Sequence, residues 1–146
     1  IEIKGNAGDY IGASYRGSTQ GMGGGKIIIH GNAGSEVGCF MKNGLIEVCG
    51  NVKRFAGMHM KDGTVFVRGN SEGRAGAQML NGKIIVCGYI PSILPTFTID
   101  DIRPKVKVDG DEAEGPFYRF TGDLADNGDG KLFVFKTKNP HLSAYE

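Results

Sequence analysis

The residue types best suited to metal binding or nucleophilic chemistry in this 146-residue chain are three cysteines and three histidines. Cys49 and Cys87 occupy equivalent positions of a repeated pattern but are two repeats apart, roughly 9–10 Å if each repeat adds one strand. That separation is too long for a disulfide. His30 and His59 fall at different positions in their repeats, so they do not converge with the cysteines. Three cysteines without close spacing fit a reducing cytoplasm, and we expect no metal site.

A glycine-rich segment at residues 16–24 is the next candidate site, because such segments can bind phosphate. A P-loop needs four residues between its first glycine and a Gly-Lys pair that is followed by Ser or Thr. Here Gly21 is one position too close to Gly25-Lys26, and Ile27 follows. We therefore expect a loop that bulges from one corner of the fold, without a phosphate site.

The remaining reactive side chains also lack a catalytic pattern. Asp123, Asp126 and Asp129 do not have the alternate spacing of an EF-hand, so turn chemistry explains them better. No serine lies in a nucleophile-elbow signature. The sequence predicts no catalytic, cofactor-binding or metal-binding residue.

The elements that would position these side chains are set by glycines that recur every 19 residues. Sharp corners that need positive φ are one reason for such glycines. A fixed period of this kind is typical of stacked repeats that share one core. The three sets are Gly25, Gly44, Gly63 and Gly82; Gly31, Gly50, Gly69 and Gly88; and Gly38, Gly57 and Gly76.

Each repeat has alternating apolar residues of the kind found in β-strands. A second strand is expected around the middle glycine of each repeat, where Met41, Met60 and Met79 share one register and serve as core filler. Asn32, Asn51 and Asn70 also share a register and could form an amide ladder. The side chains expected to point inward from the first strand are Ile27, Ile29, Ile46, Val48, Val65, Val67, Ile84 and Val86.

These patterns predict an all-β protein, a β-helix (β-solenoid) with 19-residue coils and a small C-terminal β appendage. The coils are expected at residues 1–88, a proline-containing cap at 89–99, and the appendage, packing on the solenoid, at 100–146. A hexapeptide-repeat transferase is disfavoured because 19 is not a multiple of six. The repeat pattern places the first residues within a strand, so we expect further coils or a partner upstream.

The charge distribution argues against two classes of partner. Residues 1–99 carry ten Lys or Arg against six Asp or Glu, and residues 100–146 carry seven against ten. Neither part is polarised enough to indicate nucleic acid or an anionic membrane. No apolar run approaches the length of a transmembrane helix. We expect a cytoplasmic protein.

Several segments resemble the β-helical scaffold subunit of archaeal formylmethanofuran dehydrogenases. They are residues 5–17 (GNAGDYIGASYRG), the coils through residue 88, and residues 91–97 (PSILPTF), 115–124 (GPFYRFTGDL) and 139–143 (NPHLS). The coils are also similar to the β-helix of glutamate synthase large chains, so the cap and tail segments discriminate between the two families.

The resemblance implies a non-catalytic scaffold in a cytoplasmic complex that reversibly reduces carbon dioxide onto methanofuran in methanogenesis and related C1 metabolism. It implies that a tungsten or molybdenum pterin, iron–sulfur clusters and a binuclear metal site belong to other subunits, which are this chain's expected partners. The alternatives are a structural domain of a glutamate-synthase-like enzyme and the related β-helical subunit of a bacterial formyltransferase/hydrolase complex.

One row of residues predicts where a partner could bind. Ile28, Glu47, Phe66 and Ile85 share an outward register, yet three of the four are apolar. A row of this kind needs a cover. Either the C-terminal segment folds back over it, or a catalytic subunit docks there with Phe66 as anchor and Arg68 on the rim. The predicted interface is Ile28, Phe66, Arg68 and Ile85.

Overall fold

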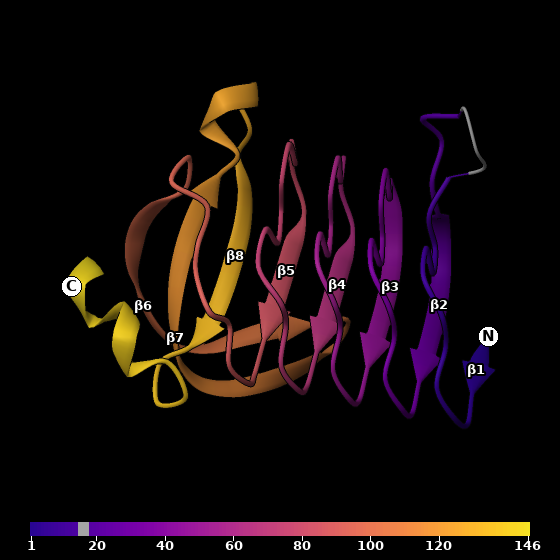
Figure 1. The fold of residues 1–146 in the computed structure, drawn as a ribbon, viewed down its shortest axis with the longest axis horizontal. Helices are drawn as coiled ribbons and strands as arrows, with labels where there is room; N and C mark the ends of the chain where they lie inside the picture. Colours follow the sequence, from indigo (N-terminus) through magenta and orange to yellow (C-terminus); the bar gives the residue numbers. More distant parts are fainter. Residues whose placement is uncertain (15–17) are drawn as a thin grey trace.

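The structure is a computed structural model that describes residues 1–14 and 18–146 (Figure 1). The predicted bulging loop at 16–24 therefore lies partly outside the described residues. The described secondary structure is β-strands and two short 3₁₀ helices, neither of them long and apolar enough to cross a membrane. The elements are β1 (Glu2–Ile3), β2 (Gly23–Ile29), β3 (Asn43–Val48), β4 (Thr64–Val67), β5 (Lys83–Val86), β6 (Thr98–Val108), β7 (Asp111–Gly122), η1 (Leu124–Asp126), β8 (Gly130–Phe135) and η2 (Pro140–Tyr145).

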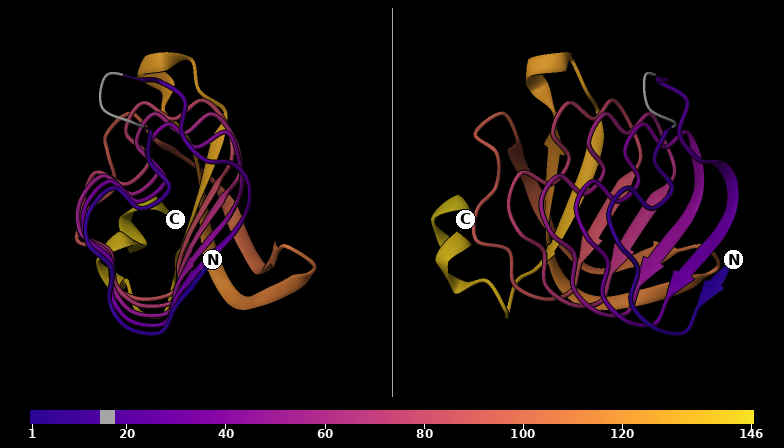
Figure 2. Two further views of the ribbon diagram at one scale, coloured as in Figure 1. Left: turned by 90° about the vertical axis from the view of Figure 1, so that its right-hand side faces the viewer. Right: turned by 45° about the vertical axis from the view of Figure 1, so that its right-hand side comes forward.

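The strands form one mixed sheet in the order β1-β2-β3-β4-β5-β8-β7-β6. Strands β1 to β5 and β8 pair in parallel, whereas β7 pairs antiparallel with both β8 and β6. Ile27 pairs with Ile46, which pairs with Val65, so strands β2 to β5 are offset by 19 residues from one to the next. The segments that connect these strands follow nearly the same path, one behind another (Figure 2).

The predicted fold class, a β-helix with 19-residue coils, is wrong. The structure is an open, mixed eight-stranded sheet in which each repeat contributes one strand. In the C-terminal segment, β8 pairs directly with β5 and brings β7 and β6 into the same sheet.

The second strand of each repeat is absent because the backbone around the middle glycine turns. In one repeat Glu36, Gly38 and Phe40 all have positive φ, at 58°, 73° and 60°. Residues in this left-handed region cannot continue an extended strand. The N–H of Met41 instead donates to the carbonyl of Gly38 within the turn, and the N–H of Phe40 donates to Met58 of the next repeat. The apolar residues alternate in this segment because their side chains pack into the core, although the backbone is not extended.

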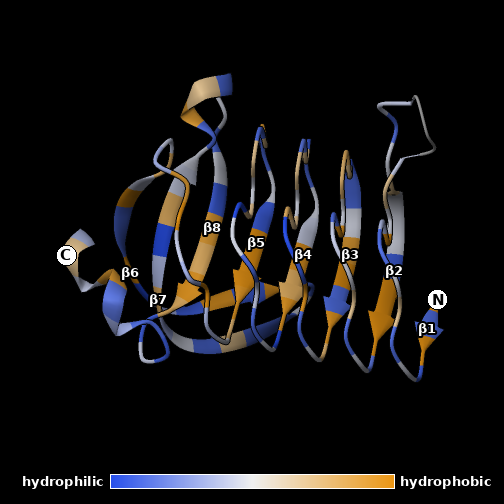
Figure 3. Cartoon of the chain, in the orientation of Figure 1, coloured by the Kyte–Doolittle hydropathy of each residue, from blue (hydrophilic) through white to orange (hydrophobic). Residues whose placement is uncertain are grey.

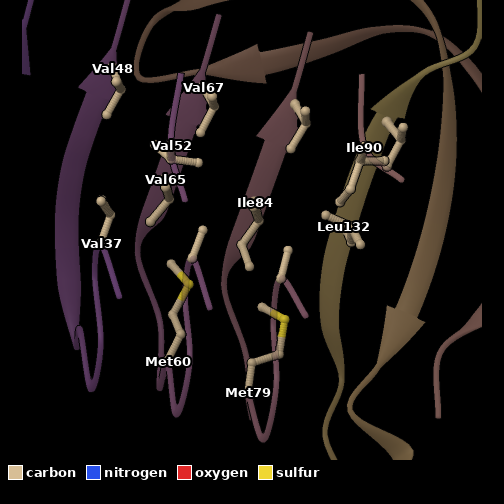
Figure 4. Close-up of a cluster of buried hydrophobic side chains, with 14 of the residues drawn as sticks. Val37, Val48, Val52, Met60, Val65, Val67, Met79, Ile84, Ile90 and Leu132 are labelled. Atoms are coloured by element: carbon tan, nitrogen blue, oxygen red, sulfur yellow. The ribbon is translucent and has the colours of Figure 1, made fainter. Parts of the chain in front are cut away.

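The core lies between the parallel strands and these turns. Met41, Met60 and Met79 are fully buried, which confirms their assignment as core filler. The side chains predicted to point inward from the strands are buried as well, with the exception of Ile27. Ile27 lies on β2, near the start of the sheet, where it is half-buried and packs against the same cluster. Figure 4 shows Met60 and Met79 in the same cluster as Val65 and Ile84. Hydrophobic residues follow strands β2, β4, β5 and β8, and the connecting segments are more hydrophilic (Figure 3).

A ladder of asparagines joins successive repeats. Asn32 Oδ1 accepts a hydrogen bond from the N–H of Asn51, and Asn51 Oδ1 accepts one from Asn70, both at 2.8 Å. The predicted ladder therefore forms, with the side chain of one repeat bonded to the backbone of the next. A Cβ at Gly50 would overlap Asn32 Oδ1, so this set of glycines permits close approach and does not supply positive φ.

The C-terminal segment closes the core and is fixed by Asn139. Ile90, Ile93 and Phe97 of the expected cap are buried in the main core. Asn139 is fully buried; its Nδ2 donates to the carbonyls of Gly88 and Phe135, and its Oδ1 accepts the N–H of Ile90. The tail is thus attached to the end of the last repeat by a fully bonded side chain.

Candidate docking surface

The outer face of the sheet carries the residues that the sequence singled out. Strand pairing places Ile28, Glu47, Phe66 and Ile85 side by side in one register. Alternation along each strand directs this register away from the main core. The β6–β7 hairpin lies on this side of the sheet, outside the stacked coils of the repeats in the end-on view (Figure 2).

The hairpin covers part of the predicted interface. Phe66 is 5% exposed and Ile85 is fully buried, within a second apolar cluster. Ile28 is half-buried, and Arg68 is exposed. The apolar row had two explanations, a cover by the C-terminal segment and the docking of a catalytic subunit. At Phe66 and Ile85 the structure shows the first, because the C-terminal segment folds back over these side chains. The other members of the cluster are Leu45, Val106, Val108, Ala113, Phe117 and Phe133.

Polar contacts hold the hairpin on the sheet. Lys26 Nζ lies 3.3 Å from a carboxylate oxygen of Asp109 at the hairpin tip, and Lys83 Nζ donates to the carbonyl of Lys107 at 3.1 Å. The two lysines belong to the parallel strands β2 and β5. The ion pair is exposed and contributes little, about 0–1 kcal/mol, so burial of the apolar cluster is the main contribution to the contact.

Arg68 lies at the edge of the covered region. Its guanidinium carbon is 4.8 Å from the centroid of the Phe66 ring, and its Nε is 3.0 Å from Glu47 Oε2. The hydrogen bond with Glu47 raises the pKa of Arg68 despite partial desolvation. The guanidinium is therefore a fixed positive charge beside a buried aromatic ring.

A hollow of about 350 Å³ separates this part of the sheet from the hairpin. Phe66, Arg68 and Cys87 line it on the sheet side, and Glu112 and Glu114 line it on the hairpin side. Acidic and basic groups are both present, so the hollow has no uniform charge that would select an anion or a cation.

The thiols near this face are poor nucleophiles. Burial raises the pKa of Cys87 to about 11, and burial followed by the nearby Glu47 carboxylate raises that of Cys49. Cys39 lies elsewhere in the core, and desolvation together with Glu36 raises its pKa to about 11. A thiol reacts as its thiolate, so these three cysteines are almost fully protonated at neutral pH.

Metal ligands do not converge in the part of the chain that the structure describes: no group of three or more His, Cys, Asp or Glu side chains could hold a metal ion there. His30 pairs with Glu2 at 2.7 Å on the outer face, whereas the His59 ring stacks on Phe40. His30 follows strand β2 and His59 lies in a turn, so these two rings do not converge on one site.

Sequence reasoning missed two features. Asn139, which attaches the tail, is a lone asparagine with no repeat position to distinguish it. The turn residues Phe40, Phe55, His59 and Arg74 were also passed over, although Phe40 and His59, and likewise Phe55 and Arg74, are 19 residues apart. That spacing was a usable signal, but the changing residue types hid it.

Comparison with known proteins gives a match among solved structures. No protein-family model matches the sequence, and no curated protein matches it. Among solved structures, the chain is similar to a chain of the formyltransferase/hydrolase complex (FhcABCD) from Methylorubrum extorquens, determined in complex with methylofuran. The similarity is to a chain of a multi-subunit complex. The sequences are 31% identical, the TM-score is 0.77, and the match covers 92% of this chain but only 55% of the other.

Proposed function

We propose that this chain is a non-catalytic subunit of a multi-subunit complex that handles formyl groups in C1 metabolism, of the formyltransferase/hydrolase type. The observation that supports the proposal is the 31% identity and TM-score of 0.77 to a chain of such a complex. Since the match covers 92% of this chain, it includes most of the C-terminal segment as well as the repeats. A similarity limited to the repeats would have fitted a glutamate-synthase-like protein equally well.

A structural role is consistent with the chemistry of the side chains. The raised pKa values of the thiols disfavour nucleophilic catalysis. Arg68 and Glu47 are paired with each other, and Lys131 contacts Thr121, Asp100 and Asp129. These groups stabilise the fold and shape its surface, and we propose that the chain's partners supply the catalytic groups and any metals.

The part of the outer face that the hairpin leaves open is a proposed contact with another subunit. Ile28 is half-buried there, and the exposed Arg68 lies at its margin. Arg68 pairs with Glu47, the register partner of Ile28, and arginine is enriched at protein interfaces. Phe66 and Ile85, covered by the chain's own hairpin, would contribute indirectly by fixing Arg68 in place.

Purification of the tagged full-length protein from its native host tests the proposal. We expect other subunits to co-purify in fixed stoichiometry, and the assembly to transfer or hydrolyse formyl groups. Purification of the chain alone under mild salt would contradict a role as a subunit.

Elemental analysis of the same assembly separates the two C1 complexes. Formyl-transfer activity without tungsten, molybdenum or iron–sulfur clusters would support the formyltransferase/hydrolase type. Tungsten or molybdenum together with iron would instead support formylmethanofuran dehydrogenase. A metal retained at one equivalent by the isolated chain would contradict the proposal that other subunits hold the metals.

A further inference from the structure

Two rows of turn residues adopt a backbone conformation that side chains disfavour. All have φ between 55° and 63°, although none is glycine, asparagine or aspartate. A Cβ makes this left-handed region unfavourable, and residues held in it cluster at active sites and ligand clamps. The rows are Tyr10, Glu36, Phe55 and Arg74, and Phe40, His59 and Gln78.

The side chains in these rows contact one another across repeats. The Phe40 and His59 rings stack at a centroid distance of 4.4 Å and an interplanar angle of 3°. The Arg74 guanidinium carbon lies 5.6 Å from the centroid of the Phe55 ring. Phe55 is half-buried and Arg74 is exposed, so the pair holds a guanidinium at the surface in a restricted position.

This pair borders a hollow of about 450 Å³ between the turns and the cap segment. Phe55 and Arg74 form one wall, Ile93 and Leu94 are apolar residues of the other, and Ser92 adds a hydroxyl. The site therefore combines an apolar surface with one cation. That composition suits a ligand with a carboxylate next to an aliphatic or aromatic group.

The charges around the hollow favour an anionic ligand. Arg74 has no carboxylate within 4.0 Å in residues 1–14 and 18–146. Asp123 lines the hollow, but it is 5% exposed and its carboxylate accepts the N–H groups of Gln78 and Ala125. Because the oxygens of Asp123 already accept these hydrogen bonds, the guanidinium of Arg74 remains available for a bidentate ion pair with an external carboxylate.

We propose that this hollow binds an acidic segment of a partner subunit. An Asp or Glu of the partner pairs with Arg74, and an adjacent apolar side chain packs against Phe55 and Ile93. The proposal rests on the proposed function, because it requires a complex with other subunits. Arginine stacked on an aromatic ring at the margin of an apolar hollow is the kind of anchor that dominates interfaces.

Charge reversal in the native complex tests this. The tagged full-length chain with Arg74→Glu should recover at least about tenfold less of its partner subunits than the unchanged chain, since reversal replaces attraction by repulsion. Arg103→Glu on the exposed edge strand β6 is the matched control and should recover them normally. Arg74→Gln removes the charge with little risk to folding and should give an intermediate loss.

The results of these experiments distinguish failure of the docking site from failure of the proposed function. Normal recovery with both Arg74 variants overturns the docking site and leaves the proposed function intact. Failure of the unchanged chain to recover any subunit overturns both. A photo-crosslinking residue at Ser92 should form its crosslink to an acidic peptide of a partner subunit; a crosslink to nucleic acid or to an uncharged segment would also overturn the proposal.

Discussion

The guanidinium of Arg68 lies over the ring of Phe66, at 4.8 Å from its centroid, although the two residues were predicted to contact a partner. Phe66 is 5% exposed because residues of the β6–β7 hairpin pack over it. The ring therefore contributes to stability within the chain, and the cation at its edge remains accessible.

We predict that Phe66→Asp lowers the free energy of unfolding of the isolated chain by about 3 kcal/mol or more, because it places a charge among buried apolar groups. Urea denaturation measures the change. Ile102→Asp on β6, at a residue that is 40% exposed, is the control and should have a small effect. An unchanged unfolding midpoint for Phe66→Asp would contradict the hairpin cover.

Met60→Lys tests the inner core. Met60 is fully buried, so an ammonium group there would lack a partner and should cost several kcal/mol, enough to unfold a marginal domain. Met58→Lys, two residues earlier at a half-buried position, should be tolerated far better. Thermal unfolding followed by circular dichroism compares them, and equal melting temperatures would show that the inward register is misassigned.

Asn139→Ala tests the attachment of the tail. The substitution leaves the carbonyls of Gly88 and Phe135 and the N–H of Ile90 without their partner. Because these buried groups would then lack a hydrogen-bond partner, the free energy of unfolding should fall by about 2–4 kcal/mol. Hydrogen exchange at Ile90 should also become faster. Asn81→Ala, at an exposed asparagine, is the control, and slow exchange at Ile90 in Asn139→Ala would argue against the contact.

The buried carboxyl of Asp123 should make the free energy of unfolding depend on pH. Desolvation raises its pKa, but hydrogen bonds from Thr96, Gln78 and Ala125 outweigh this and hold the pKa below its ordinary value. A carboxyl with a depressed pKa stabilises the fold above its unfolded pKa of about 3.9, and this contribution is lost as the pH falls toward the folded pKa. Asp123→Asn should be less stable at neutral pH.

The same variant should also lose less stability than the unchanged protein when the pH falls from about 6 to about 3. Urea denaturation across that range measures both slopes. Asp126→Asn, which removes a neighbouring carboxylate of η1, is the control for a substitution in this turn. Parallel curves for Asp123→Asn and the unchanged protein would contradict the assignment.

The cysteines predict slow thiol chemistry. Burial raises the pKa values of Cys39 and Cys87 to about 11, so little thiolate exists at neutral pH. A thiol reagent should modify these residues slowly in the native protein and rapidly in denaturant, with mass spectrometry identifying each site. Fast native modification of Cys87 would show that the hairpin opens readily.

The sequence by itself determined which residues align across repeats. Because side chains alternate along a strand and the glycines recur at a fixed interval, the buried positions of Ile46 and Val65 and the asparagine ladder at Asn32 and Asn51 followed from spacing alone. Local segments also carried the resemblance to subunits of C1 complexes. The broad expectation of a subunit in such a complex agrees with the similarity to a chain of a formyltransferase/hydrolase complex.

The tertiary structure alone decided how the repeats are closed. The turn at Phe40 depends on a hydrogen bond to Met58 in the next repeat, and alternating apolar residues cannot distinguish such a turn from a strand. The pairing of β8 with β5 and the burial of Phe66 under the hairpin join residues far apart in the chain. Contacts of this kind depend on the free energy of the whole arrangement, which no local pattern encodes.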